Sequence, residues 1–136
     1  MVQNIMHDPL FLTRKAVPAT KDDAEIARDL MDTLIANREA CVGMAANMIG
    51  KAVSIIAFND EGKFTLMYNP EITKKDEPYE TEEGCLSLSG VRKTTRYQTI
   101  RVRFQDAQWR TLTKTYKGWT AQIIQHEVDH LNGILI

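Results

Sequence analysis

Residues 120–133 read TAQIIQHEVDHLNG, and this stretch decides the fold. Its apolar side chains recur at the spacing of one helix face: Ile123, Ile124, Val128 and Leu131. This periodicity predicts an α-helix from Thr120 to about Asn132. Gly133 is well placed to end the helix, because glycine adopts the left-handed conformation of a helix C-terminus at little cost.

Within this helix, His126 and His130 are four residues apart and therefore share one face, with Cβ atoms about 5–6 Å apart. Both imidazoles can reach a single cation, and Glu127 is near enough to address a water on that cation without being a ligand. A divalent metal lowers the pKa of such a water to about 7 and polarises a carbonyl, while a carboxylate moves the proton. The pattern predicts a mononuclear catalytic metal site. The alternative is a surface helix that carries two unrelated histidines.

A catalytic site of this kind needs a third protein ligand and an open fourth position. The residues after His130, LNGILI, contain no histidine, cysteine or carboxylate side chain, so we look for this ligand upstream. The candidates are His7, Cys41, Cys85 and the many carboxylates. His7 is expected to be an exposed N-terminal residue.

Cys85 is the best candidate for the third ligand. It lies in EGCLS at 83–87, where glycine lets the backbone approach closely and the thiol can bind as thiolate. Cys41 is interpreted more simply as a small buried apolar residue. A disulfide between the two cysteines is a minor alternative, because cytosolic thiols stay reduced.

The remaining chain predicts one further helix and several strands. Thr20 can cap a helix that continues with an apolar stripe to Ile35. Residues 52–58 and 64–70 flank the turn sequence NDEG and predict a hairpin. The segments 99–104 and 111–116 predict two more antiparallel strands. Residues 1–136 are therefore expected to form a small single α+β domain of short antiparallel strands packed around the C-terminal helix, with an N-terminal helix.

Composition excludes little but indicates a cytoplasmic protein. The 136 residues carry 17 basic and 18 acidic side chains, a net charge of −1, which gives no argument for binding nucleic acid or an anionic membrane. No apolar run approaches the roughly 20 residues of a membrane span. The first residues, MVQNIMHDPLF, do not resemble a secretory signal, because Asp8 and Pro9 interrupt the apolar stretch.

Three blocks together resemble the peptide deformylase family: GMAANM at 43–48, EGCLS at 83–87 and QHEVDH at 125–130. The resemblance implies that Cys85, His126 and His130 hold one divalent ion, ferrous iron in the family, which zinc, nickel or cobalt can replace. It also implies Glu127 as general acid and base. The implied reaction is hydrolytic removal of formyl from the N-terminal methionine of nascent polypeptides, at the ribosome.

The resemblance also places the donors that stabilise the developing oxyanion. The backbone N–H of Leu86 would be one, and a glutamine that ends the glycine block would be the other. This sequence has Met48 there, and a thioether cannot donate a hydrogen bond. Three interpretations follow: a slower enzyme, a substitute donor at Asn47, or a catalytically silent protein that binds peptide N-termini. Met48 could also simply fill the core.

Several residues match family positions that contact the substrate. By resemblance, Gly43 and Gly84 offer backbone groups to an extended peptide, although turn geometry explains them equally well. Four others match positions around the methionine pocket or could belong to the core: Val42, Trp119, Gln122 and Ile123. Asp129 is expected to pair with a basic residue such as Arg96, and Glu83 either braces its loop or is exposed.

Relatives often continue beyond the HExDH helix, whereas this sequence stops at Ile136; we expect the ligands to be unaffected. The chain is expected to be a monomer or homodimer.

Overall fold

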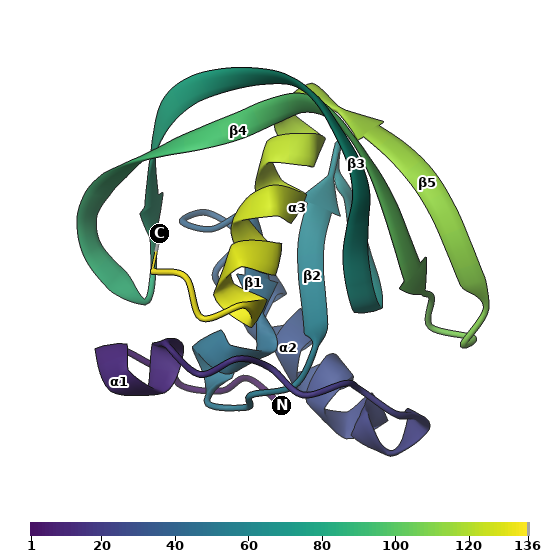
Figure 1. The fold of residues 1–136 in the computed structure, drawn as a ribbon. Helices are drawn as coiled ribbons and strands as arrows, with labels where there is room; N and C mark the ends of the chain where they lie inside the picture. Colours follow the sequence, from purple (N-terminus) through teal and green to yellow (C-terminus); the bar gives the residue numbers. More distant parts are fainter. Residues whose placement is uncertain (136) are drawn as a thin grey trace.

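A computed structural model describes residues 1–135 (Figure 1). The elements follow in this order: α1 (Pro9–Leu12), η1 (Lys21–Asp23), α2 (Ala24–Ala36), β1 (Gly43–Ala45), η2 (Ala46–Ile49), β2 (Ile55–Asp60), β3 (Lys63–Cys85), β4 (Leu88–Gln105), β5 (Thr111–Lys117) and α3 (Gly118–Leu131). The strands form one antiparallel sheet in the order β1-β2-β3-β4-β5. The expected α+β architecture is confirmed.

Helix α3 passes through the centre of the molecule, and β3 and β4 arch over it (Figure 1). It begins two residues earlier than expected, at Gly118, and ends before Gly133, whose φ of 74° gives the left-handed turn anticipated there. Its apolar face packs into one of two core clusters, where Ile124 is fully buried beside side chains from β2 and β4. The central position of α3 explains why this helix organises the fold.

The predicted hairpin is present, since β2 and β3 pair from Ile55↔Tyr68 to Asp60↔Lys63. The expectation of short strands is wrong for β3 and β4, which contain 23 and 18 residues. Much of this two-stranded arm is exposed on both faces, so its sequence lacks the apolar alternation by which a half-buried strand is recognised. Register shifts after Tyr68 and Ile72 add the bends that curve the arm.

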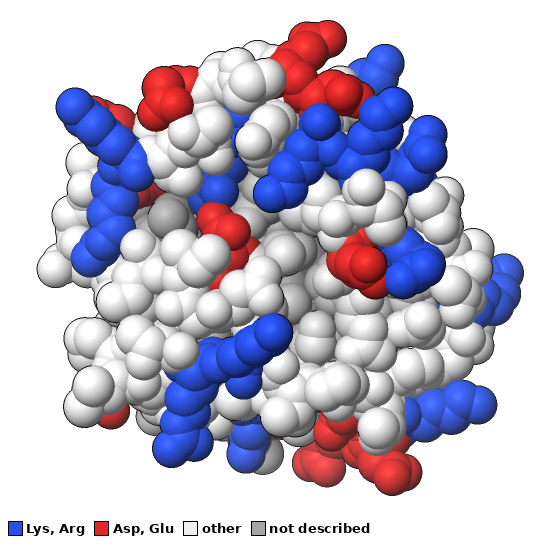
Figure 2. Space-filling model, in the orientation of Figure 1, with Lys and Arg blue, Asp and Glu red and all other residues white. Residues whose placement is uncertain are grey.

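The N-terminal helix begins as expected near Thr20, whose side chain accepts a hydrogen bond from the Asp22 N–H. The first turn is a 3-10 turn, and the α-helical part, α2, follows at Ala24. Helix α2 packs Leu30 and Leu34 into the second core cluster, against β1, η2 and β2. None of the helices between residues 1 and 135 is both long and apolar enough to cross a membrane. Figure 2 shows acidic and basic side chains interspersed over one face of the molecule.

Candidate metal centre

Three donor atoms converge where the end of β3 meets α3. The Cys85 Sγ lies 3.3 Å from the His130 Nε2, which in turn lies 3.1 Å from the His126 Nε2. All three donor atoms are within 4.8 Å of one another. The edge of a tetrahedron with metal–ligand bonds of about 2.1–2.3 Å is roughly 3.4–3.7 Å, so the spacing fits a small divalent cation held by one thiolate and two imidazoles. Among residues 1–135 no other group of donors meets this geometry.

A buried carboxylate supports His126 from behind. The Nδ1 of His126 lies 2.8 Å from the Glu83 Oε1, which leaves Nε2 directed at the other donors. Arg96 donates to both carboxylate oxygens, at 2.7 and 3.0 Å, and also to Asp129 at 2.6 Å. Burial acts to raise the pKa of Glu83, but the hydrogen bonds from His126, Arg96 and Gln122 outweigh it and lower the pKa to about 2. The anticipated pairing of Asp129 with Arg96 is confirmed.

The backbone of His130 is supported by Asn47. The Asn47 amide nitrogen donates to the carbonyl oxygen of His130, and both residues are fully buried. The amide thus holds the helix backbone, and Asn47 is not among the residues that line the cavity beside the donors, which argues against it as the substitute oxyanion donor.

Glu127 is buried beside the donors, and its Oε1 has no hydrogen-bond partner in the described part of the chain. A Cβ added at Gly43 would lie 2.9 Å from Oε2 of this carboxylate, so only glycine lets β1 approach it this closely. Burial raises the pKa of Glu127 to about 7. A carboxyl group tuned to this range can both accept and return a proton near neutral pH.

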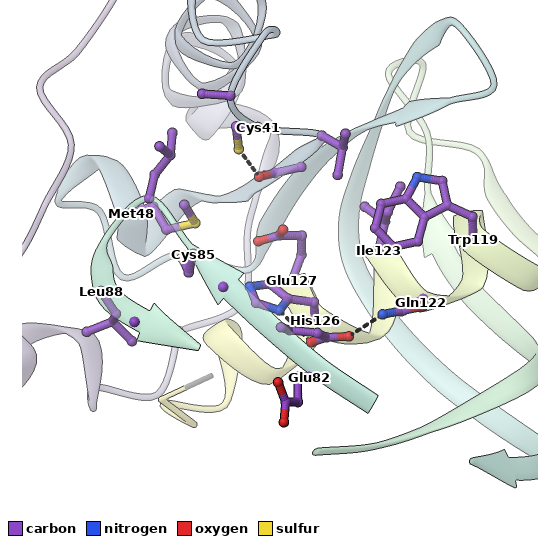
Figure 3. Close-up of a pocket in the computed structure, with 17 residues that line it drawn as sticks. Cys41, Met48, Glu82, Cys85, Leu88, Trp119, Gln122, Ile123, His126 and Glu127 are labelled. Carbon is purple, nitrogen blue, oxygen red and sulfur yellow. Dashed lines mark hydrogen bonds and ion pairs between the residues drawn. The ribbon is translucent and has the colours of Figure 1, made fainter. Parts of the chain in front are cut away.

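The site opens into a cavity of about 490 Å³ (Figure 3). Met48 and Cys85 lie on one side of Glu127, whereas Ile123 and Trp119 lie on the other. Every residue assigned to substrate by resemblance lines this cavity: Val42, Gly43, Gly84, Trp119, Gln122 and Ile123. Leu86, in the turn between β3 and β4, lines it as well. The residues expected to take part in one site are thus brought together, with Trp119 61% exposed at the surface.

The backbone of Gly43 faces the cavity side of β1. Val42 accepts a hydrogen bond from the Asn59 N–H of β2, so the alternation of an antiparallel ladder turns the N–H and C=O of Gly43 away from β2. The thiol of Cys41 donates to the Gly43 carbonyl at 2.8 Å. Cys41 packs against the core as expected, but it is only half-buried and its thiol is hydrogen-bonded; both cysteines, which the structure describes, are free thiols.

Met48 fills the core at the edge of the cavity and is 1% exposed. Its sulfur accepts a weak hydrogen bond from the Ala45 N–H at 3.5 Å. The side chain supplies no donor to the cavity, which agrees with the expectation drawn from its chemistry.

Sequence reasoning missed two features of the site. Glu83 is buried and braces the β3–β4 arm through Arg96, as one of the two alternatives expected, but it also holds His126, which the sequence did not indicate. The only sequence signal was an acidic residue beside the EGCLS glycine. His7 is exposed as expected, yet its Nδ1 lies 3.1 Å from the Ser87 carbonyl in the Cys85 loop.

Comparisons with known proteins agree with this geometry. Residues 2–136 match the family described as polypeptide deformylase. The chain is 52% identical to a peptide deformylase of Clostridium beijerinckii over 136 residues, all of both chains, and 38% identical to one of Dictyoglomus thermophilum over 135 residues, 95% of this chain and 85% of that one.

Solved structures give the same result. The crystal structure of the Thermotoga maritima peptide deformylase matches with a TM-score of 0.89 at 29% identity, covering 99% of this chain and 95% of that one. A class I type b peptide deformylase from Acinetobacter baumannii with bound Met-Ala-Ser matches with a TM-score of 0.89 at 26% identity, covering 99% and 97%. On the family match, the identities and the shared fold, this chain belongs to the peptide deformylase family.

Proposed function

We propose that this chain is a metallohydrolase that removes the formyl group from N-formyl-methionyl peptides, with Cys85, His126 and His130 holding one divalent cation. The observation that supports this most directly is the convergence of three donor atoms beside a buried carboxylate oxygen that has no partner. A bound cation would polarise the formyl carbonyl and acidify the attacking water. Residues of the chain supply proton transfer, oxyanion stabilisation and substrate binding.

Glu127 is the proton-transfer group. Burial raises the pKa of this carboxyl above its ordinary value, which favours accepting the proton of the attacking water and returning it to the departing amine. The Leu86 N–H, in the turn after Cys85, is one donor to the developing oxyanion. Glu83 fixes the orientation of His126 through Nδ1, as outer carboxylates do for metal-binding imidazoles.

The peptide lies extended between β1 and the end of β3. Gly43 presents its backbone N–H to one edge of the peptide, together with a C=O that also accepts from the Cys41 thiol, and Gly84 borders the other edge. The methionine side chain enters the cavity along Val42 and Ile123, while Trp119 covers its outer end. An unbranched thioether side chain suits this apolar wall.

Ferrous iron is the proposed physiological ion, with zinc, nickel or cobalt as substitutes. A thiolate and two imidazoles suit all four of these metals, so the donor set is compatible with each. The proposed setting is the cytoplasm, where the enzyme acts on nascent chains at the ribosome as a monomer or homodimer.

The test is formate release from a formyl-Met peptide by protein prepared with Fe²⁺ under anaerobic conditions. We expect turnover that requires the metal and falls by at least 100-fold in Glu127→Gln. Metal analysis of both proteins keeps loss of the ion separate from loss of the proton-transfer group. Cleavage of unformylated peptides at a similar rate would instead identify a peptidase and overturn the proposal.

Met48 motivates a second candidate, a silent deformylase-like protein that binds peptide N-termini. This protein would bind a formyl-Met peptide in an equilibrium titration yet release no formate with any of the four metals. Turnover by the wild-type iron form at a rate typical of enzymes would exclude it.

A further inference from the structure

Gln122 lies on α3 and lines the cavity, and both ends of its amide are hydrogen-bonded to protein side chains. The Oε1 accepts from the Tyr79 hydroxyl at 3.1 Å. The Nε2 donates to the Glu83 Oε2 at 2.9 Å, the contact that the dashed line at Gln122 marks in Figure 3. This assignment of the amide is fixed by chemistry, because a carboxylate oxygen can only accept. Both ends of the side chain are therefore occupied.

We propose that Gln122 is a positioning residue for the metal site, acting through Glu83 on His126. The connection runs from the Tyr79 hydroxyl through the Gln122 amide to one oxygen of Glu83, and from the other oxygen to the His126 Nδ1 at 2.8 Å. This inference rests on the proposed metal site, and it assigns Gln122 a role besides lining the pocket.

The Gln122 amide is one of four hydrogen-bond contacts that fix the orientation of the Glu83 carboxylate. Its Oε1 is shared by His126 and Arg96, whereas Oε2 receives only the Arg96 Nε, at 3.0 Å, and Gln122. Without Gln122, Oε2 keeps only the bond from the Arg96 Nε, and the carboxylate is held by Arg96 and His126 alone, with one restraint from α3 fewer. The His126 ring is hydrogen-bonded to this carboxylate through Nδ1. A shift of the carboxylate would therefore turn the ring and move the His126 Nε2 away from the Cys85 and His130 donor atoms.

Glu83 and the side chains that hold it come from three elements, β3, β4 and α3. Tyr79 lies opposite Arg96 in the β3–β4 ladder, so the arm that arches over α3 supplies the hydroxyl, the guanidinium and the carboxylate together. Helix α3 supplies the amide and the imidazole, one turn apart. The arm and the helix are thus joined at the metal site by hydrogen bonds to Glu83.

Gln122 lines the cavity and also contacts the carboxylate that supports the metal site. A side chain bound in the cavity packs on the stem of Gln122, whose amide restrains the carboxylate behind His126. Loss of an outer hydrogen bond of this kind typically weakens metal affinity by about 10–100-fold. We expect the loss in Gln122→Met, which keeps the length and apolar stem of the side chain but removes both hydrogen bonds.

The test measures Zn²⁺ and Co²⁺ affinity of metal-free protein by competition with a chromophoric chelator. Gln122→Met should bind about 10–100-fold more weakly, and Tyr79→Phe should shift the same way by a smaller factor. Tyr97→Phe is the matched control, since the Tyr97 hydroxyl makes no hydrogen bond within residues 1–135, and it should bind within twofold of wild type. The visible spectrum of the Co²⁺ form should change in Gln122→Met, which reports a displaced ligand.

Thermal unfolding of the metal-free proteins distinguishes positioning from stability. The inference holds if metal affinity falls while the metal-free midpoint stays within a few degrees of wild type. It is overturned if Gln122→Met binds both ions as tightly as wild type with an unchanged Co²⁺ spectrum, or if its metal-free form is unfolded. If wild type itself binds neither ion, the proposed function fails first, and the two failures are distinct.

Discussion

Replacing Met48 with glutamine should increase turnover. Met48 lies at the edge of the cavity, and its sulfur takes only a weak hydrogen bond from the Ala45 N–H, at 3.5 Å. In Met48→Gln the carbonyl end of the amide can accept that N–H at a shorter distance. The NH₂ end is then free to donate toward the substrate oxyanion.

The magnitude follows from the value of one such donor, which is typically 10²–10³ in kcat, or about 2.7–4 kcal/mol of transition-state stabilisation. We therefore expect kcat to rise by about 100-fold with a much smaller change in KM. Met48 is 1% exposed, so the substitution also brings an amide into a buried position. Because the NH₂ end of that amide has no protein partner in the absence of substrate, the cost in unfolding free energy should be about 1–3 kcal/mol.

The assay is formate release by the iron form at saturating formyl-Met peptide, alongside urea unfolding. Met48→Leu is the matched control, because leucine has similar volume and also lacks a donor, and its kcat should stay within threefold of wild type. The reasoning would be refuted if Met48→Gln folds, binds metal normally and turns over at the wild-type rate. In that case another donor already stabilises the oxyanion.

Three further substitutions test the surroundings of the site. Gly43→Ala should reduce kcat/KM by at least tenfold, because its Cβ would lie 2.8 Å from the Ile123 Cγ2 and 2.9 Å from the Glu127 Oε2. Steady-state kinetics with metal analysis measure this, and an unchanged kcat/KM in the metal-loaded variant would contradict it. Glu83 has a folded-state pKa of about 2, below its ordinary 4.5, so its stabilisation is present above pH 4.5 and lost as the pH falls toward 2. Metal-free Glu83→Gln should accordingly lose less unfolding free energy than wild type between pH 5 and pH 2, and parallel pH curves would contradict this. Gly133→Ala should destabilise by more than about 1 kcal/mol in urea unfolding, since φ is 74° and the added Cβ would meet a backbone carbonyl near α1; an unchanged midpoint would be the opposing result.

The parts of the fold that the sequence predicted are those where burial leaves a local pattern. Strand β2 buries both faces, one in each core cluster, and α3 packs an apolar stripe into the core, so a continuous apolar run and a helical apolar spacing were enough to find them. The exposed half of the β3–β4 arm has no buried face, and its length was missed. Its order comes from cross-strand pairing over the helix, which no short window of sequence contains.

The sequence likewise predicted only those parts of the site that a local pattern reveals. Two of the proposed ligands lie four residues apart on one helix, and that spacing is visible in the sequence. The support for His126 is different, because Glu83 is 43 residues away and its burial depends on Arg96 arriving from a third segment. The role of the Gln122 amide depends on Tyr79 in the same way. Such contacts follow only from the tertiary arrangement.

The arch of β3 and β4 over α3 also has a consequence for the order of folding events. Cys85 and His130 are separated by 45 residues, so a long loop must close before the thiol meets the imidazoles. Contacts of such high sequence separation form slowly, whereas the helix that carries both histidines can form locally and early. A refolding chain should therefore gain helical signal well before it takes up cobalt or zinc, and capture of the ion marks the moment when the arm closes.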